Sequence, residues 1–264
     1  MAVVIWTSGP ALASESLIID GTGDSQEILR KLSERYEELH PGARVMVPDS
    51  VGSGGGIKSV LQGQAGLART ARPLKSKEAE SGLSQVLFAW SPVVFAAHPS
   101  VASVRSVTLD QILDIYAGKT GNWTALGGPD HKLYPVNREE GDSSRTVINA
   151  FLAKALDNAQ GMGTAGKVFY TTGDTVLALK RNAYAIGFVP LSEAKAAGLH
   201  MFALDSVFPD EAAVKGKTYP LVTPFYLVKP SDPSPLAIDF IDFILSEPAR
   251  AMMREQGVFP ADRN

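Results

Sequence analysis

The chain has no cysteine among its 264 residues. This absence excludes disulfide bonds, thiolate zinc sites, iron–sulfur clusters, a cysteine nucleophile and a lipid-modified cysteine. A surplus of positive charge is also absent, because 25 Lys and Arg residues are set against 28 Asp and Glu residues, for a net charge of −3. Proteins that bind nucleic acid duplexes usually carry a basic excess, so the composition argues against nucleic acid as a partner.

Long hydrophobic runs and histidines are scarce as well. No stretch approaches the roughly 20 apolar residues that a spanning helix needs, so we expect no membrane span. The four histidines are scattered, and both a G-x-S-x-G motif and a P-loop are missing. A G-x-G-x-x-G match at 161–166 follows a predicted helix, which is the wrong context. Because a Ser–His–Asp triad is assembled in space, a hydrolase stays a weak alternative. We expect no enzyme activity and no cofactor.

The amino terminus has features of an export signal. Residues 2–6 are apolar, and Ala11-Leu12-Ala13 has the A-x-A form of a signal-peptidase site. The basic segment that usually precedes such a run is missing, so we interpret residues 1–16 as a signal-peptide remnant. The alternative is an ordinary first strand. The export interpretation predicts a soluble periplasmic protein.

Strands and helices alternate along the chain. Apolar strands are predicted at 17–19, 44–47, 91–97, 133–136 and 185–189, and amphipathic helices follow several of them, the first over 26–39. Two strand–glycine loop–helix units within the first 65 residues favour an α/β fold with a parallel sheet. Two long apolar runs, at 91–97 and 219–228, indicate a chain that crosses twice between two lobes. We expect one lobe from 17–94 with 224–264, a second from 95–223, and a ligand cleft between them.

Three polar loops each end a strand and open a helix. They lie at 22–25, 52–56 and 141–145. A helix amino terminus presents unpaired N–H groups and a positive dipole end, so it binds an anion without a counter-charge. Arg138, just before the third loop, adds a planar guanidinium suited to an oxyanion. Each loop alone could be a helix cap. Together they predict a site for a small oxyanion.

At this point the sequence resembles a known family, the phosphate-binding (PstS-type) proteins of ABC importers. The likeness covers nearly the whole chain after residue 16. It rests on motifs in matching order: Gly52-Ser-Gly-Gly-Gly-Ile-Lys58, Thr70-Ala-Arg-Pro-Leu74, Leu109-Asp-Gln-Ile-Leu-Asp-Ile-Tyr-Ala-Gly-Lys119, Asn122-Trp123, Leu126-Gly-Gly-Pro129, Asn137-Arg-Glu-Glu-Gly141 and Ala185-Ile-Gly-Phe-Val189.

The resemblance implies a type II periplasmic binding protein that closes on phosphate and delivers it to an inner-membrane ABC permease. It places ligand contacts on Ser53, Arg138, Ser143, Ser144 and the backbone around 23–25. Arg72 precedes Pro73, which favours an extended backbone and a side chain that reaches across a cleft. An ion pair with a surface carboxylate is the open alternative for Arg72. The candidate ligand-binding residues are Thr22, Gly23, Asp24, Ser25, Ser53, Gly54, Arg72, Arg138, Asp142, Ser143 and Ser144.

The chain departs from the family at three positions. Asp24 stands where the family usually has Thr, Asp142 where it has Ser, and Ala71 where many members have Asp or Ser. A carboxylate in an anion site is repelled unless the ligand oxygen facing it carries a proton. Either these aspartates cap helices, or the anion is another oxyanion such as tungstate or molybdate, or the site prefers a more protonated phosphate.

Two other classes stay open. Two carboxylates with serine hydroxyls could hold a hard cation, although Arg138 argues against a metal. A sensor or scavenger could use the same fold without an importer, because fold does not fix function. The prediction is a monomeric binding protein for inorganic phosphate or a similar oxyanion.

Overall fold

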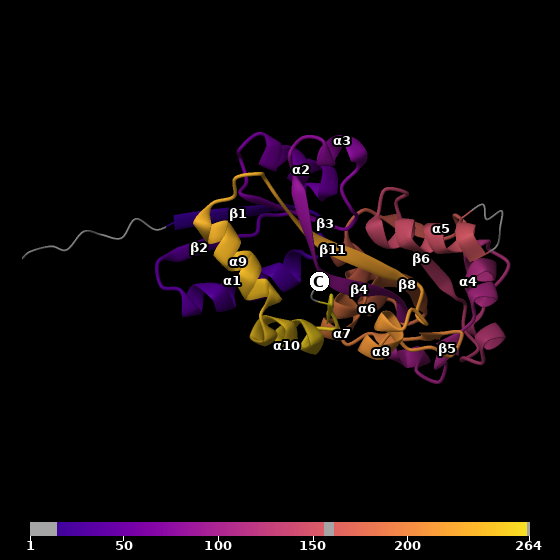
Figure 1. The fold of residues 1–264 in the computed structure, drawn as a ribbon. Coiled ribbons are helices and arrows are strands. Elements are labelled where there is room, and N and C mark those ends of the chain that lie inside the picture. Colours follow the sequence, from indigo (N-terminus) through magenta and orange to yellow (C-terminus); the bar gives the residue numbers. More distant parts are fainter. Residues whose placement is uncertain (1–14, 156–160, 263–264) are drawn as a thin grey trace, which may run out of the picture.

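The computed structural model describes residues 15–155 and 161–262. The predicted cleavage after Ala13 lies outside these residues. In the described part, strands join into one long sheet with the order β2-β1-β3-β11-β4-β8-β6-β7, and β9 and β12 also pair with β4 (Figure 1). The strands are β1 (Glu15–Gly21), β2 (Ala43–Met46), β3 (Leu67–Thr70), β4 (Ser84–Ala97), β6 (Tyr134–Arg138), β7 (Lys167–Phe169), β8 (Ala185–Pro190), β9 (His200–Met201), β11 (Val222–Lys229) and β12 (Phe259–Pro260).

Helices cover both halves of this sheet, and a separate pair of short strands, β5 (Ser106–Val107) and β10 (Ala203–Leu204), lies at one end (Figure 1). The helices are α1 (Gln26–Leu39), α2 (Gly52–Leu61), α3 (Ser76–Ala79), α4 (Leu109–Tyr116), α5 (Ser143–Ala155), α6 (Thr172–Arg181), α7 (Leu191–Ala196), α8 (Glu211–Lys215), α9 (Pro235–Leu245) and α10 (Glu247–Glu255). None of the described helices is long and apolar enough to cross a membrane.

At each end of the sheet the neighbouring strands run parallel to one another, as the alternation of strands and helices predicts. β1 pairs in parallel with β2 and β3, and β6 pairs in parallel with β7 and β8. In each parallel set, a helix returns the chain after a strand, so the helix starts gather at the strands' carboxyl ends. The α/β class is confirmed.

β4 and β11 connect two hydrophobic cores. They form an antiparallel ladder that runs from the Ser84–Lys229 pair to the Pro92–Val222 pair. Phe88 of β4 packs into a core with β1, α1 and α9, and Phe95 of the same strand packs into a core with α4 and α5. One strand thus anchors in both cores. The proposed boundary near residue 223 falls in this ladder, the one near residue 94 lies in β4 just beyond its last pair, and both stay a prediction.

The glycine run at 52–56 is the main local difference from expectation. The sequence predicts a loop there, whereas α2 already begins at Gly52. The reason lies at Gly56, where an added Cβ would come within 2.6 Å of the Asp20 carbonyl oxygen and of the Gly21 Cα. The glycine therefore allows α2 to pack against the end of β1. Glycine is needed at position 56 because the helix backbone lies so close to β1, and the glycine run therefore does not indicate a flexible loop.

Two other elements differ from the expected bounds. β4 begins at Ser84, seven residues before the predicted strand, and the predicted final helix is followed by a second one, α10. The first half of β4 pairs with β11 along its length, so its apolar run at 86–90 belongs to the same strand, which continues through Ser91 and Pro92. By contrast, the helix predicted over 26–39 has the bounds of α1.

We expect Gly56→Ala to destabilise the fold by about 1–3 kcal/mol, because the methyl group would push α2 away from β1. Gly54→Ala is the matched control. It lies in the same helix with nothing within 4 Å of its Cβ position, so it should leave stability unchanged or raise it slightly. Urea unfolding measures both variants. Equal stability of the two would show that the contact at Gly56 can relax.

Candidate functional site

A cleft of about 700 Å³ lies where α1, α2, α5 and α6 begin. These four helices follow strands from both ends of the sheet, so their amino termini converge on one space. The lining residues are Thr22, Gly23, Asp24, Gln26, Glu27, Asp49, Ser50, Gly52, Arg138, Glu139, Gly141, Asp142, Ser143, Tyr170, Thr171, Thr172, Gly173 and Glu193. Convergent helix starts create a positive dipole field that favours an anion.

Arg138 is the cation of this cleft. It ends β6, and only 6% of its surface is exposed. One terminal nitrogen donates to Asp142 Oδ2 at 2.5 Å, and the other donates to the hydroxyls of Thr172 and Thr175 at 3.2 Å. The Nε–H has no hydrogen-bond partner among the described residues. Three side chains thus hold Arg138, those of Asp142, just before α5, and of Thr172 and Thr175 on α6, while its Nε–H keeps no protein partner among the described residues.

Asp142 has two roles in the structure. Its Oδ1 accepts a hydrogen bond from the Arg145 backbone N–H at 2.9 Å, which is the geometry of a helix cap for α5. Its Oδ2 forms the buried ion pair with Arg138. The capping alternative that the sequence left open therefore describes Asp142, and the same carboxylate also engages the cation of the cleft.

Asp24 differs from Asp142. Its Oδ2 is shielded from solvent and has no hydrogen-bond partner within the described ranges. Burial, followed by the nearby Asp142 carboxylate, raises the pKa of Asp24 to about 6, while Ser143 and Arg138 oppose that rise. Asp24 caps no helix, because the residue before α1 is Ser25 and no side chain caps it. The cleft thus holds one acid with an oxygen left unpaired.

A second buried arginine, Arg69, supports the first loop from behind. Arg69 lies on β3 and is fully buried. It donates to three backbone carbonyls, those of Ile19, Thr22 and Pro48, the last two at 2.7 Å. Burial lowers its pKa to about 10, so it stays charged at neutral pH. Through these bonds Arg69 fixes two segments that line the cleft, 22–24 and 49–50.

The family model described as "PBP superfamily domain" matches residues 7–248 of this chain. This chain belongs to that superfamily. It is 26% identical to the phosphate-binding protein PstS of Borreliella burgdorferi, over 90% of this chain and 88% of that one. It is 27% identical to the PstS of Bacillus subtilis, over 96% of this chain and 83% of that one.

Solved structures agree with this family. A protein of Clostridium perfringens, assigned as a phosphate ABC transporter substrate-binding protein and solved with bound phosphate, superposes with a TM-score of 0.80 at 26% identity. The match covers 94% of this chain and 100% of that chain. An ABC-type phosphate transport receptor from Vibrio cholerae gives a TM-score of 0.68 at 25% identity, covering 92% and 99%. The resemblance to PstS-type phosphate-binding proteins, drawn from the sequence motifs, is confirmed, and with it the type II binding-protein fold.

The structure brings six of the eleven predicted residues to the cleft wall: Thr22, Gly23, Asp24, Arg138, Asp142 and Ser143. Ser25, Ser53, Gly54, Arg72 and Ser144 are not among its lining residues. The Ser53 hydroxyl instead accepts a hydrogen bond from the Ala71 N–H at 3.1 Å. Arg72 forms a bidentate pair with Glu78, both contacts at 2.8 Å, as the alternative interpretation expects. Ligand contact by these residues stays a prediction.

Sequence reasoning missed two parts of the site. The start of α6, at 171–173, lines the cleft next to Arg138 although it lies more than 30 residues away along the chain. Its signal was the Thr171 hydroxyl, which caps the helix by accepting from the Asp174 N–H at 3.1 Å. The other omission is Arg69. Its signal was an arginine in the short strand Leu67–Thr70, all of whose residues are buried, because a buried guanidinium needs several acceptors.

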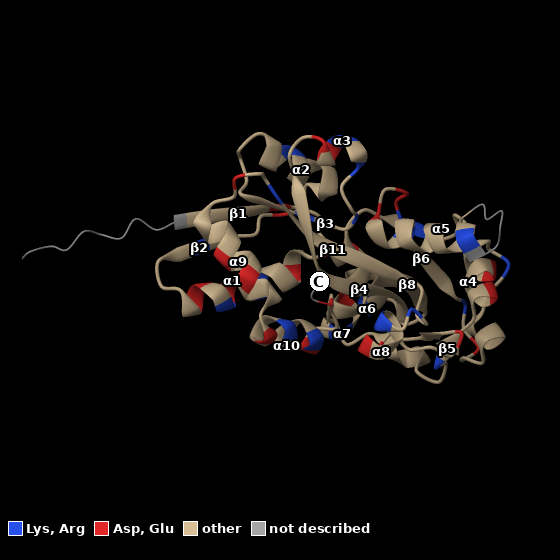
Figure 2. Ribbon diagram, in the orientation of Figure 1, with Lys and Arg blue, Asp and Glu red and all other residues tan. Residues whose placement is uncertain are grey.

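The lining is acidic. In the described structure, Arg138 shares it with six carboxyl groups, which belong to Asp24, Glu27, Asp49, Glu139, Asp142 and Glu193. Burial raises the pKa of Glu193, and the neighbouring Glu27 adds to that rise. Along the described part of the ribbon, acidic and basic residues are interspersed (Figure 2). Repulsion in the cleft therefore grows with the negative charge that a ligand carries.

We expect Arg69→Met to destabilise the protein by about 3 kcal/mol or more, because it leaves three buried carbonyls without a donor. Methionine matches the length of the side chain, so lost volume contributes little. Arg35→Met is the control, since Arg35 forms an exposed ion pair with Glu38, and should change stability by about 0.5 kcal/mol or less. Urea unfolding at neutral pH gives both values. Similar losses for the two variants would remove Arg69 from its supporting role.

Proposed function

We propose that this chain is the substrate-binding protein of an ABC importer and binds inorganic phosphate in the cleft, noncovalently and without catalysis. Two observations support the ligand. Relatives that match nearly the whole chain carry the name phosphate-binding protein PstS, and the Clostridium perfringens structure holds phosphate. In this chain, the observation that carries the proposal is Arg138, a buried guanidinium placed where four helices begin.

The binding mechanism is closure of two lobes, 17–94 with 224–264 and 95–223, around the anion. Helix starts α1 and α2 follow strands of one core, and α5 and α6 follow strands of the other. An anion that accepts hydrogen bonds from both sides interacts with more donors in the closed form than in the open form. It therefore shifts the population toward closure.

Arg138 supplies the charge, and it already has a partner. Asp142 occupies one terminal nitrogen of the guanidinium. The ligand would bind the remaining Nε–H and the face shared with Thr172, so that Arg138 lies between a protein carboxylate and the anion. This arrangement keeps the cation in place before the ligand arrives. Pre-positioned donors make binding stronger because no reorganisation is needed.

Asp24 makes the proton content of the ligand important. An ionised carboxylate only accepts hydrogen bonds, so a ligand oxygen that faces Asp24 needs a proton. Phosphate carries one or two protons near neutrality, whereas sulfate carries none. A sulfate ion in this cleft would leave the Asp24 oxygen without a donor and add repulsion. The same argument disfavours tungstate and molybdate.

The partners and the compartment follow from the same proposal. Delivery to an inner-membrane permease requires an exported protein, and the A-x-A pattern at 11–13 fits export. We expect a monomer, because a lobe-closing mechanism needs no second subunit. A sensor or scavenger with the same fold is the alternative. Phosphate uptake by cells that lack this protein separates the two, since only a transport role predicts slower uptake.

We expect loss of the Arg138 guanidinium to weaken phosphate binding about 100-fold, the value of a charge-assisted hydrogen bond in a dry site. Arg138→Gln alone would strand the buried Asp142 carboxylate and could unfold the protein. The double variant Arg138→Gln/Asp142→Asn removes both charges together and keeps hydrogen-bonding groups of similar size. Calorimetry with phosphate, with a melting curve as the folding check, measures the effect. An affinity of the folded double variant close to that of the wild type would remove Arg138 from the site.

We expect the phosphate affinity of the wild type to fall about tenfold or more between pH 5 and pH 8. The pKa of Asp24 is raised to about 6, so the group is neutral at pH 5 and charged at pH 8. Phosphate also loses a proton over this range, and both changes increase repulsion. In Asp24→Asn the side chain does not titrate, so the affinity should vary less with pH. Calorimetry across the range decides the question.

The control for this pH series is Asp49→Asn, an exposed carboxylate at the cleft rim, which should keep the wild-type profile. If the wild-type affinity is constant or rises toward pH 8, Asp24 does not face the anion, and the requirement for a protonated ligand is wrong.

A further inference from the structure

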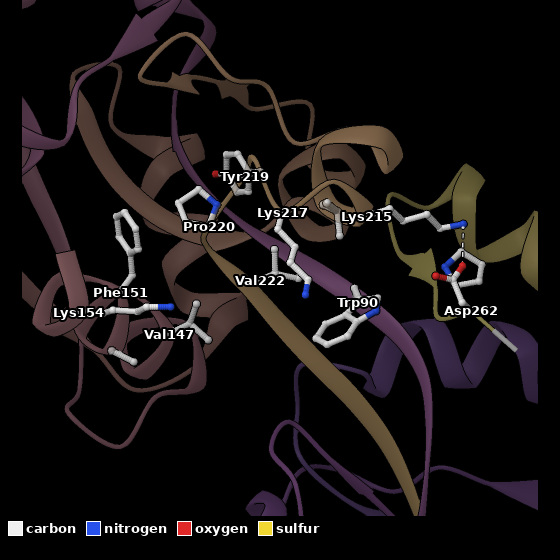
Figure 3. Close-up of a pocket in the computed structure, with 13 residues that line it drawn as sticks. Trp90, Val147, Phe151, Lys154, Lys215, Lys217, Tyr219, Pro220, Val222 and Asp262 are labelled. Carbon is white, nitrogen blue, oxygen red and sulfur yellow. Dashed lines mark ion pairs between the residues drawn. The ribbon is translucent and has the colours of Figure 1, made fainter. Parts of the chain in front are cut away.

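A second cavity lies beside the crossing strands, away from the oxyanion cleft. It has a volume of about 810 Å³ and shares no lining residue with the cleft. Its floor is apolar and includes Trp90 of β4, Val222 of β11 and Phe151 of α5, as Figure 3 shows. The cavity thus touches both strands of the β4–β11 ladder, and Pro260 of β12, which pairs with β4, adds to its wall.

The polar groups at this cavity are mostly donors. Lys154 and Lys217 both line the cavity, the Lys154 amino group beside Val147 and the Lys217 amino group between Val222 and Trp90 (Figure 3). Among the described residues, neither amino group has an ion-pair or hydrogen-bond partner, and the Trp90 indole N–H has no acceptor. The carboxylate at the rim, Asp262, lies 3.4 Å from Lys215 and is therefore already paired. The lysine amino groups are exposed to solvent, so a ligand acceptor at this cavity would compete with water and with no carboxylate of the described protein.

The backbone holds Lys217 in an unusual conformation. Its φ is +58°, in the left-handed region that non-glycine residues rarely adopt. The residue follows the short helix α8, and its N–H donates to the Val214 carbonyl at 3.2 Å. This turn places the side chain over the cavity floor. Lys154 comes from a different element, the last turn of α5. Lys154 and Lys217 therefore bring two cations from separate segments to the lining of one largely apolar cavity.

We propose that this cavity is a second ligand site, which takes a small carboxylate with an aromatic or branched aliphatic body. The carboxylate would accept hydrogen bonds from Lys154 and Lys217, and the body would pack on Trp90, Phe151 and Val222. Apolar contact supplies most of the affinity, and the two ammonium groups select the charge. A phosphate ion fits this site poorly, because it has no apolar surface to place against the floor.

The test uses 4-phenylbutyrate as the probe and the uncharged 4-phenylbutanol as its matched analogue, on the full chain saturated with phosphate. We expect calorimetry to show one site for the carboxylate, bound about tenfold more tightly than the alcohol. Lys154→Gln/Lys217→Gln should abolish that difference. The control Lys58→Gln/Lys77→Gln removes the same charge on α2 and α3, outside the cavity, and should keep it. Both lysine pairs are exposed, so folding should be unaffected.

Tryptophan fluorescence gives an independent readout. In a Trp6→Phe background, the probe should change the emission of the protein and not that of the further variant Trp90→Phe, because the remaining tryptophan, Trp123, is fully buried elsewhere. Three results would overturn the proposal: no binding of the carboxylate, equal binding of carboxylate and alcohol, or loss of binding when phosphate saturates the cleft. The last result would place the probe in the oxyanion cleft instead.

Discussion

The antiparallel ladder between β4 and β11 is the constraint on which the rest of the structure depends. It pairs residues from Ser84 to Pro92 with residues from Val222 to Lys229, and its strands enter both cores. The parallel strands on either side end toward the same space, so their helices begin there. A hinge made of two paired strands can twist while it keeps its hydrogen bonds. The lobe closure that we propose would therefore need no loss of backbone pairing in this ladder.

Buried arginines solve a problem that the acidic cleft creates. A carboxylate-rich lining would repel an anion, yet added surface lysines would be screened and mobile. Arg69 and Arg138 instead place positive charge behind the loops, where low exposure keeps it unscreened. Each is held by specific oxygen acceptors, Arg69 by three carbonyls and Arg138 by Asp142 and two hydroxyls. Arg69 acts by holding the loops that line the cleft, whereas Arg138 lines the cleft itself and contacts the anion in the proposed complex.

The sequence could predict the features that local patterns encode. The amphipathic helix predicted over 26–39 forms α1 with those bounds. The sequence could not predict what arises when distant segments meet. The start of α6 reaches Arg138 only in the fold, and Gly56 was mistaken for a loop residue because composition does not reveal the neighbour that demands glycine. Arg72 and Arg69 show the same limit. The motif Arg72-Pro73 predicts a ligand contact, but Arg72 is half-buried and pairs with Glu78, whereas Arg69, three residues earlier, is fully buried beneath the cleft loops.

Asp24 and Asp142 have different roles in the cleft, although both are aspartates. Asp142 accepts from Arg138 and from the Arg145 N–H, so both of its oxygens are satisfied by the protein. It gains little from a ligand proton. Asp24 has an oxygen with no donor and lies close enough to Asp142 for its pKa to rise. In the proposed complex, discrimination between protonated and fully ionised anions is therefore assigned to Asp24. Asp142 contributes indirectly, since its charge keeps Asp24 reluctant to ionise and so ready to share a proton with the ligand.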